Sequence, residues 1–288
     1  RTHTNPAQIF DSVRDFASGK GLVSSTTAAE GAENDALYGY IGGVGQTDFT
    51  LKSGTNNIQR VNDSGRDYIG WCWRAGGNSN TFNIDGVGYS SYDNLQSANS
   101  SLPASSTSGM ITPSSMSIGT EQGFSIIKYS GTGNAITVPH GLSKVPDFII
   151  VKNLDVNDRQ WTIQHKSLTY THYIDLDSTG TAANNSNVWV AAPTSSVFSF
   201  GANPRGNENT IDHIAYCFTS IPGFSAFGSY EGNVSADGPF IYTGFKPAWF
   251  MVKNVDDGTA SSGPSWDIYD NAREPNNDGC LLYTSDAA

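Results

Sequence analysis

The chain has 288 residues, a formal net charge of −11 and a pI near 4.7, and only 15% of its residues are charged. This acidic balance argues against a nucleic-acid-binding surface, which needs clustered Lys and Arg, and no apolar run approaches the roughly 18 residues of a membrane span. Three Cys without a CxxC pair predict neither a disulfide framework nor a zinc site. We therefore expect no nucleic-acid partner and no membrane insertion.

Composition favours strands joined by polar turns. The 31 Gly, with abundant Asn, Ser and Thr, suit turns and caps better than helix surfaces. Near the N-terminus, residues 6–20 place Ile9, Val13 and Phe16 at helical spacing, so we expect a short helix or a turn there. Farther along, short β-branched or aromatic runs bounded by turn residues predict strands at 124–129, 148–152, 197–200, 214–218 and 249–252.

Internal repeats divide the chain. The octapeptide PDFIIVKN at 146–153 returns as PAWFMVKN at 247–254, 101 positions later, and a Trp-x-Ile follows each copy. Blocks from the first 75 residues return in the same order after the first octapeptide, among them LVSSTTAA as LDSTGTAA and YIGWCW as HIAYCF. We predict the rear half of a truncated first unit at 1–75, a complete second unit at 123–226 and the front half of a truncated third unit at 227–279.

Two stretches fall outside these units. Residues 76–122 are rich in Ser, Asn and Gly, so we expect a linker or a long loop there. The last nine residues, 280–288, read CLLYTSDAA and resemble the in-frame translation of a transposase adapter used in sequencing libraries. Such a segment is excluded from fold reasoning. For the units themselves, the strand pattern predicts an all-β fold of tandem antiparallel β-sandwiches, jelly-roll or lectin-like.

The sharpest polar motif is Ile-[Phe/Tyr]-Asp-x-x-Arg, which occurs with Asp11 and Arg14 and again with Asp270 and Arg273. One interpretation makes the carboxylate a catalytic acid or a sugar ligand and the arginine an anion clamp. The other is an ion pair or capping Asp that fixes a turn, and we favour it. The second unit carries His165 at the Asp position.

Other chemical candidates are weaker. His140 sits in a Pro- and Gly-bounded turn, VPHGL, where it could line a ligand surface, although a histidine satisfied by backbone is the favoured interpretation. Cys72 and Cys217 share a repeat position between aromatics, which predicts buried free thiols in strands. Acidic residues after the Lys-Asn strands could bind Ca²⁺, but no known calcium-loop pattern supports this, so we assign no cofactor. These acidic residues are Asp155, Asp158, Asp256 and Asp257.

Several long motifs carry a family resemblance. They include GFSIIKYSG at 123–131, the two octapeptides, and GFSAFGSYEGN at 223–233. The chain resembles a repeated domain of unknown function found in large virion proteins of marine and cyanobacterial bacteriophages. That resemblance implies a tail-fibre-like protein of the virion surface, made in the host cytoplasm, and supplies no catalytic residues.

The leading hypothesis for function is a structural tail-fibre segment that could also bind host-surface glycans. The alternatives are a polysaccharide depolymerase in the same setting and a passive capsid decoration protein. Because no complete catalytic set is visible, we expect no enzyme. The candidate ligand-binding residues are Asp11, Arg14, His140, His165, Asp270 and Arg273. The candidate partners are other virion proteins, host-surface polysaccharide and further copies of the chain.

Overall fold

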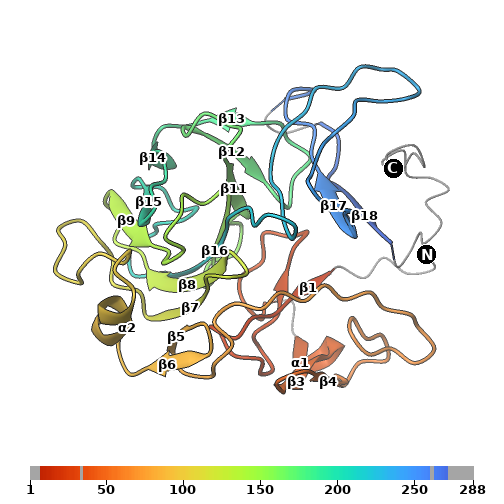
Figure 1. Ribbon diagram of the computed structural model, residues 1–288. Helices are drawn as coiled ribbons and strands as arrows, with labels where there is room; N and C mark the ends of the chain where they lie inside the picture. The colour runs from red at the N-terminus through yellow and green to blue at the C-terminus, as the bar shows by residue number, and fades with distance from the viewer. Residues whose placement is uncertain (1–6, 33–34, 260–262, 272–288) are drawn as a thin grey trace.

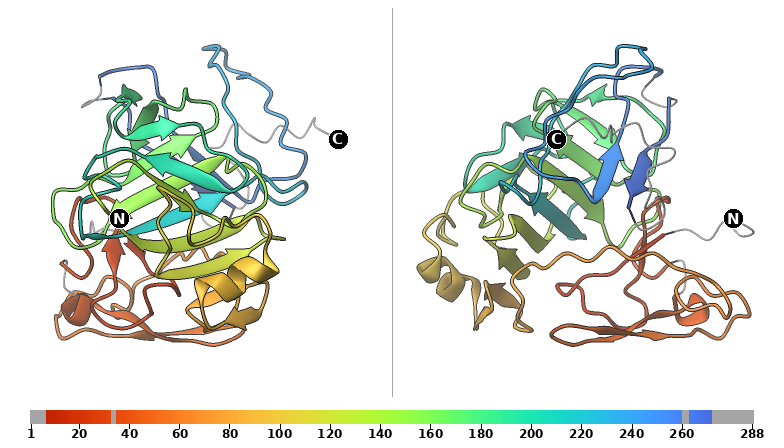
Figure 2. Two further views of the ribbon diagram at one scale, coloured as in Figure 1. Left: turned by 90° about the vertical axis from the view of Figure 1, so that its left-hand side faces the viewer. Right: turned by 45° about the vertical axis from the view of Figure 1, so that its right-hand side comes forward.

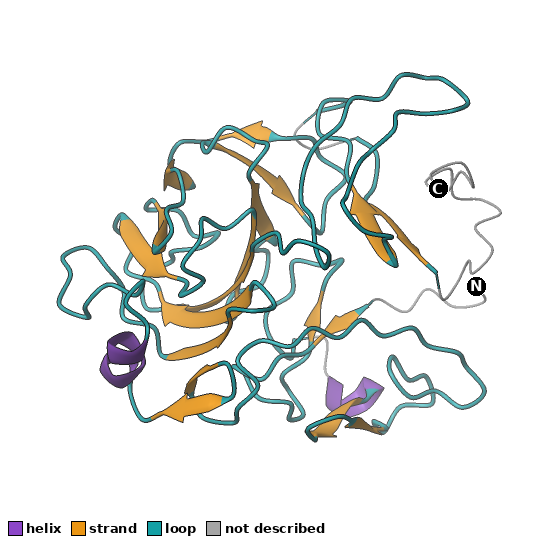
Figure 3. Cartoon of the chain, viewed as in Figure 1, coloured by secondary structure: helices purple, strands orange, loops and turns teal. Residues whose placement is uncertain are grey.

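The computed structural model describes residues 7–32, 35–259 and 263–271. The predictions made for Arg273 and for 280–288 lie outside these residues. Strands and connecting loops make up nearly all of the described chain, which has two short helices, α1 (Asp35–Tyr38) and α2 (Tyr92–Ala98) (Figure 3). The fold is therefore all-β and sandwich-like, as the composition and the short hydrophobic runs predicted.

One large sheet organises the molecule (Figure 1). Its nine strands are antiparallel except for the parallel pair β5–β7, and β16 lies at the centre with β8 and β10 on either side. In spatial order they are β13 (Ala183–Asn184), β12 (His172–Asp175), β11 (Thr162–His165), β10 (Phe148–Asn153), β16 (Asp212–Phe218), β8 (Phe124–Ser130), β7 (Ser115–Gly119), β5 (Phe82–Ile84) and β6 (Val87–Tyr89).

A three-stranded sheet covers one face of the large sheet. It consists of β14 (Trp189–Ala191), β15 (Val197–Phe200) and β9 (Ile136–Pro139), in that order. Because side chains alternate along a strand, Ile127 and Tyr129 of β8 join Phe198 and Phe200 of β15 in the main hydrophobic core. Helix α2 adds Leu95 to the same core.

The opposite face of the large sheet holds a second core. Phe124 and Ile126 of β8 point there with Tyr216 of β16, and Trp161 packs beside them. The small hairpin of β1 (Gln8–Ile9) and β2 (Leu22–Val23) covers this face, with Leu22 fully buried. The N-terminal segment therefore belongs to the core of the whole molecule.

Two further hairpins lie at the periphery. The first is β3 (Tyr40–Val44) with β4 (Phe49–Lys52), and the second is β17 (Trp249–Val252) with β18 (Asp267–Asp270). The loop between β16 and β17 projects from the body in both views of Figure 2. Its side chains Val234 and Tyr242 are exposed.

The five predicted strands are confirmed as β8, β10, β15, β16 and β17, with bounds that differ from the predictions by two residues at most. The linker prediction for 76–122 is wrong, because this stretch supplies α2 and the strands β5, β6 and β7. Its residues Met116 and Ile118 are fully buried in the main core. Residues 7–20 form β1 and a series of turns, and no helix.

The prediction of buried strand cysteines holds for one of the two. Cys217 is buried in β16, whereas Cys72 is exposed and lies outside any strand. Cys217 has β8 and β10 on either side, so its backbone is paired on both edges. Cys72 has no paired strand on either side in the described chain, and this difference accounts for the unequal burial of the two cysteines.

Candidate functional site

The predicted pair Asp11 and Arg14 lies where the N-terminal segment meets the large sheet, and both side chains are buried. One carboxylate oxygen of Asp11 accepts the backbone N–H groups of Val13 and Arg14, both at 3.0 Å. The other accepts Arg14 Nε at 2.5 Å and the Tyr216 hydroxyl at 2.7 Å. Asp11 therefore closes the turn after β1 and fastens it to β16.

The remaining donors of Arg14 are engaged as well. Its Nη1 donates to Glu30 at 3.0 Å, its Nη2 donates to the Ile9 carbonyl at 3.3 Å, and Glu30 also pairs with Lys20 at 2.9 Å. Burial by itself lowers the pKa of Arg14, but the charges of Asp11 and its other neighbours outweigh that effect and raise the pKa. Arg14 therefore stays charged inside this network.

Tyr216 takes part as a neutral donor. Burial raises the pKa of its hydroxyl well above the usual value, and the adjacent charge of Asp11 raises it further. The phenol proton is thus held on oxygen and points to the carboxylate. This geometry is that of a structural ion pair, and a ligand-binding role for Asp11 and Arg14 remains a prediction.

A second polar feature links the N-terminal segment to the end of β10. The side chain of Lys152 is buried, and its Nζ donates to the carbonyl of Thr27 at 3.1 Å and to the carbonyl of Arg159. Burial lowers the pKa of Lys152 to about 8; the charge of Asp177 opposes this effect, and the charge of Arg159 adds to it. The lysine thus bridges its own following loop and a segment that precedes it by 125 positions.

The same bridge occurs a second time. Lys253 stands at the end of β17, 101 positions after Lys152, and its Nζ donates to the carbonyl of Thr179 at 3.0 Å and to the carbonyl of Pro264. The matched blocks LVSSTTAA and LDSTGTAA align Thr27 with Thr181, and the acceptor Thr179 lies two positions before Thr181, so the second bridge repeats the first with a shift of two residues in the docking segment. Segment 22–30 thus docks on the loop after β10 as segment 175–183 docks on the loop after β17.

Two further hydrogen bonds recur between the same segments. In each place an indole N–H donates to a backbone carbonyl, and a backbone N–H donates to the residue after the Lys-Asn pair. The indole bonds are Trp161 to Val23 at 3.1 Å and Trp266 to Asp175 at 3.0 Å, and the backbone bonds are Glu30 to Leu154 at 2.7 Å and Ala182 to Val255 at 3.0 Å. One docking arrangement is therefore used twice within the chain.

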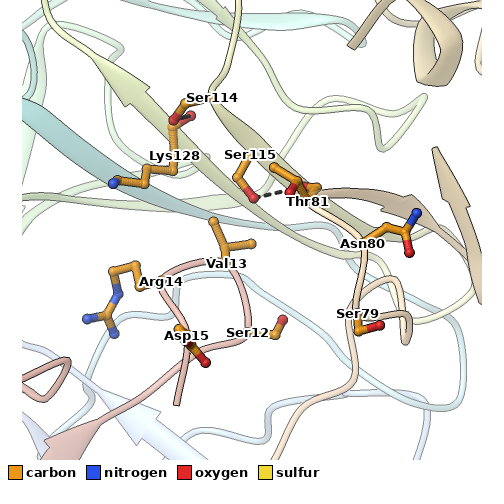
Figure 4. Close-up of a pocket in the computed structure, with 10 residues that line it drawn as sticks. All are labelled: Ser12, Val13, Arg14, Asp15, Ser79, Asn80, Thr81, Ser114, Ser115 and Lys128. Carbon is orange, nitrogen blue, oxygen red and sulfur yellow. Dashed lines mark hydrogen bonds between the residues drawn. The ribbon is translucent and has the colours of Figure 1, made fainter. Parts of the chain in front are cut away.

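A polar hollow of about 480 Å³ adjoins the Asp11–Arg14 network. Figure 4 shows the turn 12–15 on one side, segment 79–81 across from it, and residues 114–115 with Lys128 in the upper part of the view. Ser115 donates to the Thr81 carbonyl at 2.7 Å, and Lys128 forms an ion pair with Asp212 at 2.7 Å. Asp15 is the only carboxylate among the lining residues, so hydroxyl and amide groups dominate the surface. Such a lining suits hydrogen bonds to a neutral polyhydroxyl ligand.

The two predicted histidines lie elsewhere. His140 is buried in the turn after β9, where a ring nitrogen contacts the Thr194 carbonyl at 3.1 Å and the other accepts the Leu142 N–H at 3.2 Å. Burial lowers the pKa of His140 to about 4, so the ring is neutral at pH 7. Burial also lowers the pKa of His165 on β11, and its ring packs edge-on against Phe148.

Asp270 ends β18 opposite Trp249, in the same register that places His165 opposite Phe148. Of the six predicted residues, the structure joins Asp11 to Arg14 by a direct contact, and it places His140, His165 and Asp270 on three other elements.

No group of three or more metal-ligating side chains is present in the described parts of the chain. None of the helices described is long and apolar enough to span a membrane.

Sequence reasoning missed Tyr216, Lys152 and Thr27. The Lys-Asn dipeptide repeated in both octapeptides was the available signal for Lys152. Thr27 acts through its backbone carbonyl, so its side chain carries no signal. Tyr216 contacts Asp11 across 205 positions, which no local pattern reveals.

No curated protein and no solved structure matches the chain. One protein family does, and it matches twice, over residues 1–101 and over residues 91–288. Together the two matches span the whole chain. The chain therefore belongs to the family described as "Domain of unknown function (DUF7483)".

Proposed function

We propose that the chain is a segment of a stiff array of tandem β units in a structural, tail-fibre-like protein on the surface of a phage particle. The observation that carries the proposal is the lysine bridge made twice, by Lys152 and by Lys253, with the same kinds of partner. An array grows by repeating one contact between neighbouring units, and its stiffness depends on that contact. The phage setting rests on the resemblance of the long motifs.

The array interpretation also accounts for the burial of segment 22–30. Leu22 is buried in the second core of the large sheet, and Val23 and Ala29 are buried as well. A segment that docks through backbone carbonyls tolerates changes of side chain, which fits the differences between LVSSTTAA and LDSTGTAA. A unit therefore contacts its successor through backbone carbonyls and one lysine, which is buried in the first docking and partly exposed in the second.

Labelling of particles tests the structural role. An antibody raised against the purified chain is expected to label intact particles of the phage that encodes it, along a projecting structure seen by electron microscopy. A matched antibody against a non-virion protein of the same phage is the control and is expected to leave particles unlabelled. Label found only on unassembled protein in the lysate would contradict the proposal.

A second candidate function is glycan binding in the polar hollow, favoured by its lining of hydroxyl and amide groups. Repeated weak sites on an array gain avidity without new contacts. We expect the chain to co-migrate with intact host-type polysaccharide in size-exclusion chromatography. Asn80→Ala is expected to remove the co-migration, and Asn94→Ala, on the exposed side of α2, is expected to keep it. Shortened polymer would contradict simple binding and favour a depolymerase.

A further inference from the structure

The turn after β1, which we call the charged docking turn, is held by ionic contacts. Asp11 and Arg14 form a buried ion pair, and Glu30 shares the guanidinium of Arg14 at 3.0 Å. Asp11 also accepts the hydroxyl of Tyr216, on the central strand β16, at 2.7 Å. Charges and hydrogen bonds therefore fix residues 11–14 against the large sheet.

The turn after β11, the uncharged docking turn, differs at each of these positions. β11 repeats β1 in the sequence, so this turn carries His165 at the aspartate position and Leu168 at the arginine position. Ala182 takes the place of Glu30, because the backbone N–H of each donates to the residue after a Lys-Asn pair. Leu168 and Ala182 belong to an apolar cluster, whose members from the third predicted unit are Phe227, Met251, Val255 and Trp266. The ionic network of the first turn is thus replaced by apolar contacts.

The position of Tyr216, which receives the charged docking turn, also differs between units. The matched blocks YIGWCW and HIAYCF place Trp71 at this receiving position of the first predicted unit. There the ring of Trp71 lies edge-on to that of Trp249, at a centroid distance of 6.4 Å. The first unit therefore combines a charged turn with tryptophan, and the second combines an uncharged turn with tyrosine. Because the Asp-x-x-Arg motif returns at Asp270, the two kinds of turn alternate along the chain.

We propose that the residue at the receiving position decides which docking turn a unit accepts, with tyrosine accepting the charged turn and tryptophan the uncharged one. Such a rule makes the two kinds of unit alternate and disfavours docking between the wrong neighbours. The inference rests on the array of units proposed above. Its test measures contacts within one chain, so it can fail while the labelling of particles succeeds, and the reverse.

The hydroxyl of Tyr216 accounts for the first half of the rule. The carboxylate of Asp11 is buried and takes one of its four hydrogen bonds from this phenol. A tryptophan has no hydroxyl, and its single N–H lies at a different place on a larger ring. The charged turn would therefore leave a buried carboxylate short of a donor, which is costly in free energy.

The apolar surface of an indole accounts for the second half. Burial lowers the pKa of His165, so its ring is neutral at pH 7, and Leu168 offers only apolar surface. An uncharged turn has no carboxylate to accept a phenol proton, and a buried hydroxyl without a partner is unfavourable. The larger ring of a tryptophan instead adds buried apolar area beside such a turn.

Exchanging the turn and its receiving residue tests the rule in the full chain. The swapped turn is the variant Asp11→His/Arg14→Leu/Glu30→Ala, and the swapped receiver is Tyr216→Trp. Hydrogen exchange of residues 8–23 reports docking, and exchange of β15 reports whether the rest of the fold persists. We expect each swap alone to accelerate exchange in 8–23 by about tenfold or more. Both swaps together are expected to restore most of the protection.

Phe218→Trp is the matched control for the swapped receiver. Phe218 lies two residues after Tyr216 on β16, so an indole there is on the same face of the sheet but outside the receiving position. We expect this variant to leave the swapped turn unprotected. Losses of protection that simply add in the doubly swapped chain would overturn the proposal, as would equal restoration by Phe218→Trp and Tyr216→Trp.

A smaller change tests the hydroxyl without adding an indole to the second core. Tyr216→Phe is expected to accelerate exchange in 8–23 by about tenfold beside the natural charged turn, because Asp11 loses a donor. Beside the swapped turn the same substitution is expected to leave exchange unchanged. Equal acceleration in the two backgrounds would show that the residue at 216 does not distinguish the turns and would overturn the proposal.

Discussion

The carboxylate of Asp11 accepts four hydrogen bonds, and this saturation limits what the residue can do. Two come from backbone N–H groups of its own turn, one from Arg14 and one from Tyr216. A carboxylate with both oxygens engaged and its arginine shared with Glu30 has little capacity left for a ligand. Asp11 and Arg14 are residue types that often bind ligands, but here their hydrogen bonds fix the turn after β1 against β16.

Replacing the carboxylate therefore has a large effect on stability. Asp11→Asn leaves Arg14 buried without its closest counter-charge and is expected to lower the free energy of unfolding by about 3–5 kcal/mol. Asp63→Asn is the control, because Asp63 pairs with a partly exposed Arg66 at 3.8 Å and is expected to cost less than about 1 kcal/mol. Denaturant unfolding followed by Trp fluorescence measures both. Equal losses in the two variants would show that the buried pair contributes nothing special.

Buried histidines give the chain a pH dependence. Burial lowers the pKa of His140 and of His213 to about 4, below the ordinary value of 6.5. Their contribution to stability is complete above pH 6.5 and is lost as pH falls toward 4, by about 3 kcal/mol for each histidine. Asp175 acts in the opposite sense between pH 6 and pH 4, because burial raises its pKa to about 6. The two histidines together outweigh it, so we expect acid to destabilise the chain.

The variant His140→Gln isolates one of these contributions. Glutamine does not titrate, and its amide can still reach the carbonyl of Thr194. We expect the variant to be less stable than the unmodified chain at pH 7, but to lose less stability between pH 7 and pH 4.5. Urea unfolding at the two pH values gives the comparison. An identical pH dependence in both proteins would contradict the assignment to His140.

Among the elements, the sequence predicts the strands that carry a hydrophobic or aromatic run, whether they pair on both edges, as β15 does, or on one edge in the described chain, as β17 does. β8, β10 and β16 read as continuous hydrophobic runs because both of their faces are buried, and they begin and end close to the predicted residues. The sequence wrongly predicts a linker or long loop at 76–122, because the strands there have three to five residues and the Ser, Asn and Gly content is typical of a loop. The strands of this stretch form because β5 pairs with β7 and β7 pairs with β8, and a local sequence pattern does not predict such pairings.

Helix α2 shows that this stretch belongs to the core. Leu95 is fully buried in the main core, so Leu95→Ala is expected to lower the free energy of unfolding by about 2–5 kcal/mol. Ser97→Ala on the exposed side of the same helix is the control and is expected to stay within about 0.5 kcal/mol. Thermal unfolding by circular dichroism measures both variants. A near-zero effect of Leu95→Ala would restore the linker interpretation.

At the scale of the molecule, the internal repeat of the sequence is accompanied by repeated contacts in the structure. Lys152 and Lys253 make the same pair of bridges, and β17–β18 repeats the register of β10–β11. The sequence predicted which segments correspond, because matched blocks keep their order. It could not predict that segment 22–30 docks on the loop after β10, because that contact uses backbone carbonyls and joins residues more than 120 positions apart.

The measurement that tests the repeated docking most directly is hydrogen exchange of Lys152→Met and Lys253→Met beside the unmodified chain. Each substitution keeps most of the side-chain length and removes the bridging ammonium. We expect exchange to become roughly tenfold faster in 22–30 for the first variant and in 175–183 for the second. Lys166→Met, which removes a surface pair with Asp147, is expected to change neither segment. Faster exchange spread evenly over the chain, or none at either docking segment, would contradict the account.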